Sequence, residues 1–255
     1  MTAVAVDQPR IEARSRFSEV WRIVKLHLAA PSVFIGVPWL ILGSAWAISL
    51  IITIIMRGAN PGITVEDLEG MRYSWAVLSP QWYLVVVGVQ SVGLTLNFAL
   101  GFGATRRDFW LGTSLLFAMV AAFNAFAIAA LVQIEQATGG WWLGAHMFDA
   151  LWYGIDGPLV DWYTSFALQL AVLFVGAAIT TVYMRWRMKG TMTVLFSFIV
   201  LLLGGLAYLS FTQSWVPFAT WLGSIGLVGG FTIVLVLALL SAVLGYFVIR
   251  RATPR

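Results

Sequence analysis

The sequence predicts an all-α membrane protein, and its composition and hydropathy pattern lead to that class. Of its 255 residues, 60% are hydrophobic and 10% are charged, whereas soluble domains are about half apolar and about a quarter charged. Apolar stretches of about 20 residues recur along the chain, each long enough to cross about 30 Å of hydrocarbon as a helix. Because lipid leaves backbone amides unsatisfied and no alternating barrel pattern occurs, helices are the expected spanning elements.

Six transmembrane helices are expected from the apolar stretches. They cover residues 33–56, 82–104, 110–133, 162–184, 191–212 and 222–249. The chain then divides into a cytoplasmic N-terminal segment at 1–32, a six-helix transmembrane domain at 33–249 and a cytoplasmic tail at 250–255. An even number of spans places both termini on the same side of the membrane.

Basic residues give the expected orientation, because cationic segments next to a span stay in the cytoplasm. All but two of the 15 cationic side chains fall in the termini and in the second and fourth links between spans. These are Arg10, Arg14, Arg16, Arg22, Lys25, Arg106, Arg107, Arg185, Arg187, Lys189, Arg250, Arg251 and Arg255. Only Arg57 and Arg72 fall in the other links. Both termini are therefore expected in the cytoplasm. We attribute the net charge of +4 to the orientation of the chain in the membrane, since no motif organises these cations for nucleic-acid binding.

An amphipathic helix is expected just before the first span. Its apolar residues at helical spacing are Phe17, Val20, Trp21, Val24 and Leu28. Pro31 ends the pattern. We expect this helix to lie in the membrane interface, with its apolar stripe in the acyl boundary and its cations near anionic head groups. The alternative is a helix docked on the protein's own loops.

A short charged turn, 103–112, joins the second and third spans. Its defining residues are Thr105, Arg106, Arg107, Asp108 and Phe109. Thr105 is a suitable N-cap, and at most one or two helical turns fit before the apolar pattern resumes. One interpretation is a short cytoplasmic helix that presents charge and one aromatic ring to a partner. In the other, the two arginines only anchor the topology, and Phe109 belongs to the aromatic belt.

Taken together, the interfacial helix, the six spans, the cytoplasmic termini and this turn resemble the permease subunit of type-2 ATP-binding-cassette exporters. In that family the first element is the elbow helix. The turn, often Gly-x-Thr/Ser-Arg-Arg-x-Phe, is the coupling helix that docks on the nucleotide-binding subunit. The matching positions here are Gly103, Thr105, Arg106, Arg107, Asp108 and Phe109. One departure is the loop between spans five and six, which the family often elaborates and which is expected here to be a brief link at 213–221.

The resemblance implies partners that this chain does not encode. It implies a separate nucleotide-binding ATPase subunit that binds ATP and Mg²⁺, a second permease copy or a similar subunit, and the lipid bilayer of a bacterial plasma membrane. The chain carries no phosphate-binding loop, so no cofactor, catalytic residue or enzymatic activity of its own is expected. The expected cargo is amphipathic, such as a drug, an antimicrobial peptide or a lipid.

Polar residues within the spans are few. Asn97, Asn124 and Gln169 are possible pathway-lining residues, although most intramembrane amides only hydrogen-bond neighbouring helices. No ionisable residue is expected in the middle of a span, which disfavours an ion-coupled secondary carrier. That carrier and a non-transporting scaffold or sensor subunit remain the competing functions.

The long external segment 135–161 is expected to cap the translocation route, with its aromatic residues holding a short helix on the outer membrane face. His146 and Asp149 lie three residues apart, but one histidine with scattered carboxylates is a poor ligand set for zinc. No metal site is therefore expected.

Overall fold

The computed structural model describes residues 15–251, and within this range the chain is helical with no strand. The α-helices are α1 (Arg16–His27), α2 (Val37–Ala59), α3 (Val65–Leu68), α4 (Ser79–Gly93), α5 (Leu96–Gly101), α6 (Arg106–Ala137), α7 (Pro158–Phe211) and α8 (Trp215–Arg251). Short π or 3-10 turns cover Ser32–Gly36, Glu69–Tyr73, Ala76–Leu78 and Gly140–Gly144. The predicted all-α class is confirmed. Arg10, Arg14 and Arg255 lie outside the described residues.

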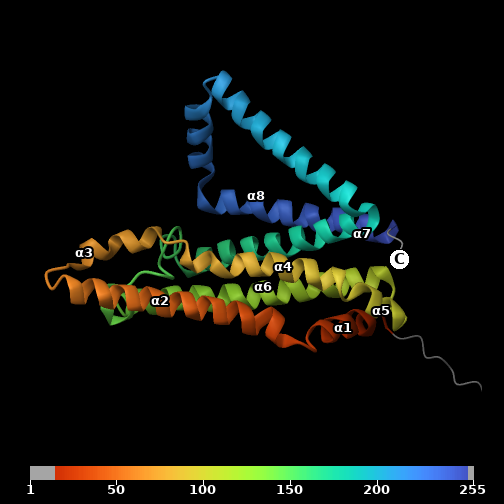
Figure 1. Ribbon diagram of the computed structural model, residues 1–255, viewed down its shortest axis with the longest axis horizontal. Coiled ribbons are helices and arrows are strands. Elements are labelled where there is room, and N and C mark those ends of the chain that lie inside the picture. The colour runs from red at the N-terminus through yellow and green to blue at the C-terminus, as the bar shows by residue number, and fades with distance from the viewer. Residues whose placement is uncertain (1–14, 252–255) are drawn as a thin grey trace, which may run out of the picture.

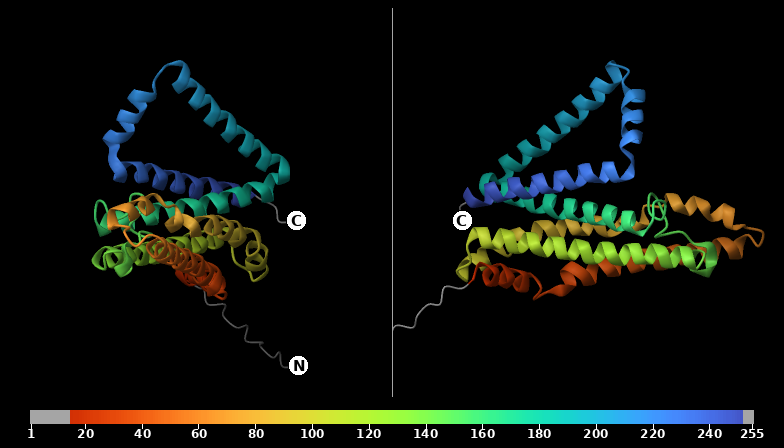
Figure 2. Two further views of the ribbon diagram at one scale, coloured as in Figure 1. Left: turned by 60° about the vertical axis from the view of Figure 1, so that its left-hand side comes forward. Right: turned by 180° about the vertical axis from the view of Figure 1, so that it is seen from behind.

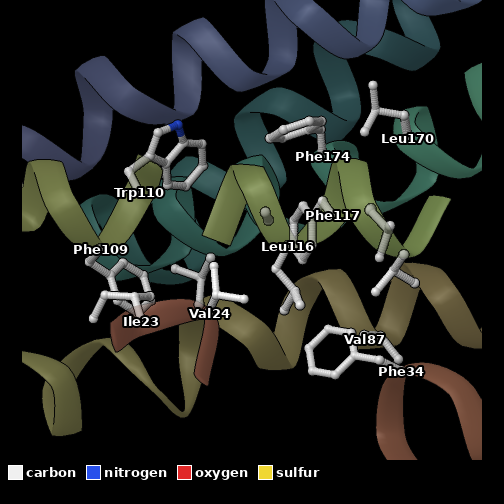
Figure 3. Packing of buried hydrophobic residues seen from close by; sticks show 14 of the residues in the cluster. Ile23, Val24, Phe34, Val87, Phe109, Trp110, Leu116, Phe117, Leu170 and Phe174 are labelled. Carbon is white, nitrogen blue, oxygen red and sulfur yellow. The ribbon is translucent and has the colours of Figure 1, made fainter. Parts of the chain in front are cut away.

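A bundle of α2, α4, α6 and the first part of α7 forms the body of the protein, with α1 across one end (Figure 1). Two glycines let α4 and α7 touch backbone to backbone, as small residues do between membrane helices. A methyl group on Gly88 would overlap the carbonyl oxygen of Leu173, and one on Gly176 would overlap that of Val85. The main core packs around this contact and includes the edge-to-face pair Phe117 and Phe174 (Figure 3).

α7 bends sharply at Arg187, where the backbone has φ 56° and ψ −150°. Such a conformation costs a residue other than glycine roughly 1–3 kcal/mol. Residues before the bend pack in the bundle, whereas residues 188–211 lead away from it (Figures 1 and 2). The predicted spans at 162–184 and 191–212 therefore lie in the two helical segments on either side of this break, which together make up the 54 residues of α7.

α8 is also broken, at Gly226, which has φ 64°. Residues 215–225 return from the tip of the diverging segment, and residues 227–251 lie along the bundle, so the three straight segments outline a triangle (Figures 1 and 2). The predicted link at 213–221 is thus wrong. Helix resumes at Trp215, since Pro217 lies in the first turn, where proline is tolerated, and the helix continues through Gly223 until the break at Gly226.

Five helical segments of the described chain are long and apolar enough to cross a membrane. The structure is therefore that of an all-helical protein compatible with several membrane spans. The start of α1, the α5–α6 turn, the bend of α7 and the end of α8 lie at the same end of the bundle, and we call this the basic end (Figure 1). The end of α2, α3 and the segment between α6 and α7 lie at the opposite end (Figure 1).

Candidate partner-coupling site

The predicted coupling turn is the beginning of α6. Thr105 has extended backbone and caps the helix, since its hydroxyl accepts a hydrogen bond from the Asp108 amide at 3.1 Å. The same hydroxyl donates to Asp108 Oδ2 at 2.6 Å. Gly103, with φ 80°, makes the preceding reversal after α5. The prediction of a separate short cytoplasmic helix is therefore wrong, because nothing interrupts helical backbone hydrogen bonding between Arg106 and the span that follows.

Phe109 points inward from this turn. Its side chain is fully buried, and its ring lies beside Ile23 and 5.9 Å from the ring of His27, both on α1 (Figure 3). The expectation that this ring is presented directly to a partner is wrong, because the helical phase that places Arg107 outside places Phe109 against α1. Phe109 instead joins α1 to the first turn of α6.

Arg106 is engaged with α8. Its guanidinium donates to the carbonyl oxygens of Ile249 and Arg250 at 3.4 and 3.2 Å. Basic side chains stabilise helix C-termini in this way, because the last carbonyls have no partner within the helix. One turn further along, the Trp110 indole donates to the carbonyl of Ala242 at 3.1 Å and fills the space left by Gly245. The first turn of α6 is thus attached to the end of α8.

The outer surface of the turn is formed by Thr105 and Arg107, which are exposed, with Asp108 half-buried beside them. Arg22 of α1 reaches the same turn and donates to the carbonyl of Phe102 at 3.2 Å. The turn that carries Arg107 therefore contacts both α1 and α8, whereas the sequence suggested a connection to spans two and three only.

α1 packs directly on α6. A methyl group on Gly112 would overlap Ile23 and the carbonyl oxygen of Val20, so the two helices approach closely. Ile23, Val24 and His27 are buried in this contact, and His27 Nε2 lies 3.0 Å from the Thr113 hydroxyl. The alternative expectation, that α1 docks on the rest of the protein, thus holds for the inner face of α1. The surface it docks on is helix α6 and not a loop.

The rest of the predicted apolar stripe of α1 is less buried. Val20, Trp21 and Leu28 are half-buried, whereas Phe17 is 71% exposed and stacks on Trp21 with ring centroids 6.3 Å apart. The predicted stripe is therefore displaced from the buried face, because Ile23 and His27 point at α6. Phe17 and Trp21 remain available to an apolar surface outside the protein.

The possible pathway-lining residues do not gather in one cavity. Asn97 is exposed on α5, near the basic end. Asn124 and Gln169 are buried in the bundle, where Asn124 Oδ1 accepts a hydrogen bond from the Trp39 indole at 2.9 Å. Both residues line a small cavity together with Gln81. The centre of a water molecule can occupy a volume of about 10 Å³ in it. That is room for about one water molecule, so in this conformation these residues enclose no cargo route. Asn124 joins α6 to α2, whereas within the described chain the side-chain oxygen of Gln169 is buried without a hydrogen-bond partner.

The opposite end of the bundle is organised by Glu135. Its buried carboxylate accepts hydrogen bonds from the backbone amides of Met147, Phe148 and Asp149 at 2.8–3.1 Å. The Trp141 indole donates to it at 2.6 Å. An anion surrounded by amide donors fixes a segment that has little regular structure of its own. The segment between α6 and α7 therefore folds over the ends of the helices as a compact cap. In place of the expected short helix it has the single turn Gly140–Gly144, in which Trp141 and Trp142 adopt left-handed backbone.

Asp149 links this cap to the α3–α4 connection. Arg72 Nη2 lies 3.0 Å from Asp149 Oδ2, and the Gln136 amide donates to Asp149 Oδ1 at 3.0 Å. His146 Nδ1 lies 3.6 Å from the same carboxylate. Burial raises the pKa of Asp149, but His146, Gln136 and Arg72 outweigh it and lower the pKa below its usual range. Within residues 15–251 no three metal-ligating side chains converge.

The structural roles of Glu135 and Arg106 were not evident in the sequence. Glu135 binds backbone 12–14 residues away, through amides that look the same in every residue type. Arg106 binds carbonyl groups more than 140 residues away. The sequence contains one signal for these roles, which is that both charged residues flank the third apolar stretch. Comparisons with protein-family models, with curated proteins and with solved structures find no match to this chain.

Replacing Glu135 with alanine should destabilise the cap. The change leaves three buried amides and one indole without their acceptor, which costs about 3 kcal/mol or more. We expect a lower thermal unfolding temperature in detergent and faster hydrogen exchange at residues 147–149. Glu66→Ala, at an exposed carboxylate of the same end, is the control. Equal exchange in both variants would contradict the role assigned to Glu135.

Acidification should loosen α1 from α6 through His27. Burial lowers the pKa of His27 from 6.5 to about 4, so the folded protein favours the neutral imidazole. The stabilisation from neutral His27 is fully present above pH 6.5 and is lost as the pH falls toward 4. The loss amounts to about 2 kcal/mol at pH 5.

A cysteine placed at Val24, which is buried in this contact, should react faster with a thiol reagent at pH 5 than the intrinsic pH dependence of thiols predicts. His27→Asn should remove that excess. If the excess persists in His27→Asn, the pH response comes from another group.

Proposed function

We propose that this chain is the membrane-spanning subunit of an ATP-driven exporter whose ATPase is a separate chain. The observation that carries the proposal is the first turn of α6, which exposes Arg107 at the basic end while Arg106, Phe109 and Trp110 connect it to α8 and α1. A partner that bound Arg107 and changed shape on ATP binding would move three helices at once. A loop that served only to orient the chain would not need these contacts.

The proposed topology has six spans with the basic end in the cytoplasm. A straight helix of 54 residues would be about 80 Å long, far more than the roughly 30 Å of a hydrocarbon core. The bend at Arg187 divides α7 into two segments of suitable length, with Arg185, Arg187 and Lys189 at the division. In this topology the cationic residues of the described chain lie on the cytoplasmic side, except Arg57 and Arg72.

A second copy of the chain is the proposed partner within the membrane. Residues 194–212 and 216–224 are almost entirely exposed although they are apolar, because the diverging part of α7 and the first part of α8 leave the bundle. The helix at 215–225 also supplies an elaboration between the fifth and sixth proposed spans, where the sequence had suggested a departure from the exporter family. Since the bundle's own cavity holds about one water molecule, the cargo route is proposed to lie between the two copies.

The apolar surfaces around that route favour an amphipathic cargo such as a drug, an antimicrobial peptide or a lipid. A scaffold or sensor subunit is the main alternative. It would keep the same fold but would show no ATP-dependent transport, and an ion-coupled carrier would transport cargo in vesicles without ATP.

Arg107→Glu should separate the chain from its ATPase without unfolding it, because the side chain is exposed. A reversed charge at an ionic contact should lower ATPase affinity roughly tenfold or more, measured by copurification and by ATP-dependent transport in vesicles. Arg16→Glu, an exposed arginine at the same end, is the matched control. Retained copurification and transport in Arg107→Glu would refute the coupling role of the turn.

Arg106→Ala in the same assay should differ from Arg107→Glu. It removes the hydrogen bonds to Ile249 and Arg250, so we expect the ATPase to bind normally while hydrogen exchange at the end of α8 rises and transport falls. Phe109→Ala is not a clean coupling variant, because losing a buried phenylalanine ring costs about 3–5 kcal/mol of stability.

The proposed second copy is testable by cross-linking, because the chain has no cysteine. Leu201→Cys, at a side chain 75% exposed on the diverging part of α7, should form a disulfide between two copies in native membranes. Phe126→Cys, at a side chain 68% exposed in the middle of α6, should not. A monomeric Leu201→Cys chain under oxidising conditions would count against the dimer.

A further inference from the structure

A groove lies at the bend of α7. It has a volume of about 430 Å³ and is lined by Val182, Trp186, Lys189, Gly190, Thr193 and Val194. This volume falls within the range of small-molecule sites, roughly 300–1,000 Å³. Most of the lining is apolar, and Lys189 is the cation on its wall. Gly190 lies against Trp186, so a methyl group at position 190 would overlap the Cβ atom of Trp186.

Lys189 lines this groove, and two further cations, Arg185 and Arg187, are its neighbours in the sequence. Within residues 15–251, neither Arg185, Arg187 nor Lys189 forms an ion pair. Arg185 stacks on the Trp186 ring at 4.4 Å, and Arg187 lies 6.0 Å from the centroid of Tyr183. Arg187 and Lys189 are exposed, so their charges are available to an anion from outside the protein.

The groove lies where the chain changes from charged to apolar. Residues 185–189 carry the three cations, whereas the exposed surface that begins at Val194 is apolar through to Phe211. A ligand that binds along this boundary needs a negative group at one end and an apolar body at the other. In a membrane, basic pockets between helices and aromatic residues at the interface suit phospholipid head groups.

We propose that the groove at the α7 bend binds an anionic phospholipid. The phosphate lies near Arg187 and Lys189, and one acyl chain follows Val182, Trp186 and Val194. An acidic protein surface would also satisfy the cations, but it would have no use for an apolar groove that continues along a membrane-spanning segment. The lipid site requires only that α7 crosses the bilayer, so it holds for a scaffold as well as for an exporter.

The charge requirement is tested on the purified full chain with phosphatidylglycerol and phosphatidylcholine, whose binding is compared by native mass spectrometry. Arg187→Gln with Lys189→Gln should reduce the preference for phosphatidylglycerol by about fivefold per charge removed. The matched control is Arg187→Lys with Lys189→Arg, which keeps both charges and should bind like the parent. Elution profile and helix content verify that both variants fold.

The groove itself is tested without changing charge. Val194→Trp fills the lining and should lower phosphatidylglycerol binding, whereas Val200→Trp, at an exposed residue outside the groove, should leave it unchanged. The proposal is overturned if the two tryptophan variants bind alike or if the doubly neutralised chain keeps its full preference. It is also overturned if neutralisation leaves lipid binding intact and instead releases a protein that copurifies with the parent, because the cations would then serve a protein contact.

Discussion

The packing of α1 and of the last turns of α8 depends on the first turn of α6, which is enclosed between these two helices. Phe109 fills the contact with α1, while Arg106 and Trp110 hydrogen-bond carbonyl groups of α8. These contacts close the bundle at the basic end with helices that are far apart in the sequence. They also explain why an exposed residue such as Arg107 would transmit a force beyond its own helix, which is the property that the proposed coupling to an ATPase requires.

The two ends of the protein use complementary chemistry for the same problem. Helix ends and irregular segments leave backbone groups without partners, and apolar surroundings supply none. At the basic end the Arg106 cation binds free carbonyl oxygens, and at the opposite end the Glu135 anion binds free amide groups. Each charge therefore has a structural role that is separate from any effect on membrane topology.

The bend at Arg187 has consequences in two directions. It directs the second part of α7 away from the bundle, which leaves a large apolar surface for lipid or a second copy. It also places Trp186 and Lys189 in the wall of a groove at the boundary between charged and apolar chain, with Arg187 between them in the sequence. A proposed lipid site at the bend and a proposed dimer contact beyond it therefore share one structural cause.

The sequence by itself determined the helical class, the apolar segments and the sorting of charge, because these follow from composition and from periodicity within one segment. It also placed the N-cap Thr105, whose partner Asp108 is three residues away. Tertiary structure decided which side of each helix is buried, and so turned Phe109 inward and displaced the buried face of α1 toward Ile23 and His27. It likewise decided the roles of Arg106 and Glu135, whose backbone partners carry no mark of residue type and are brought close only by folding.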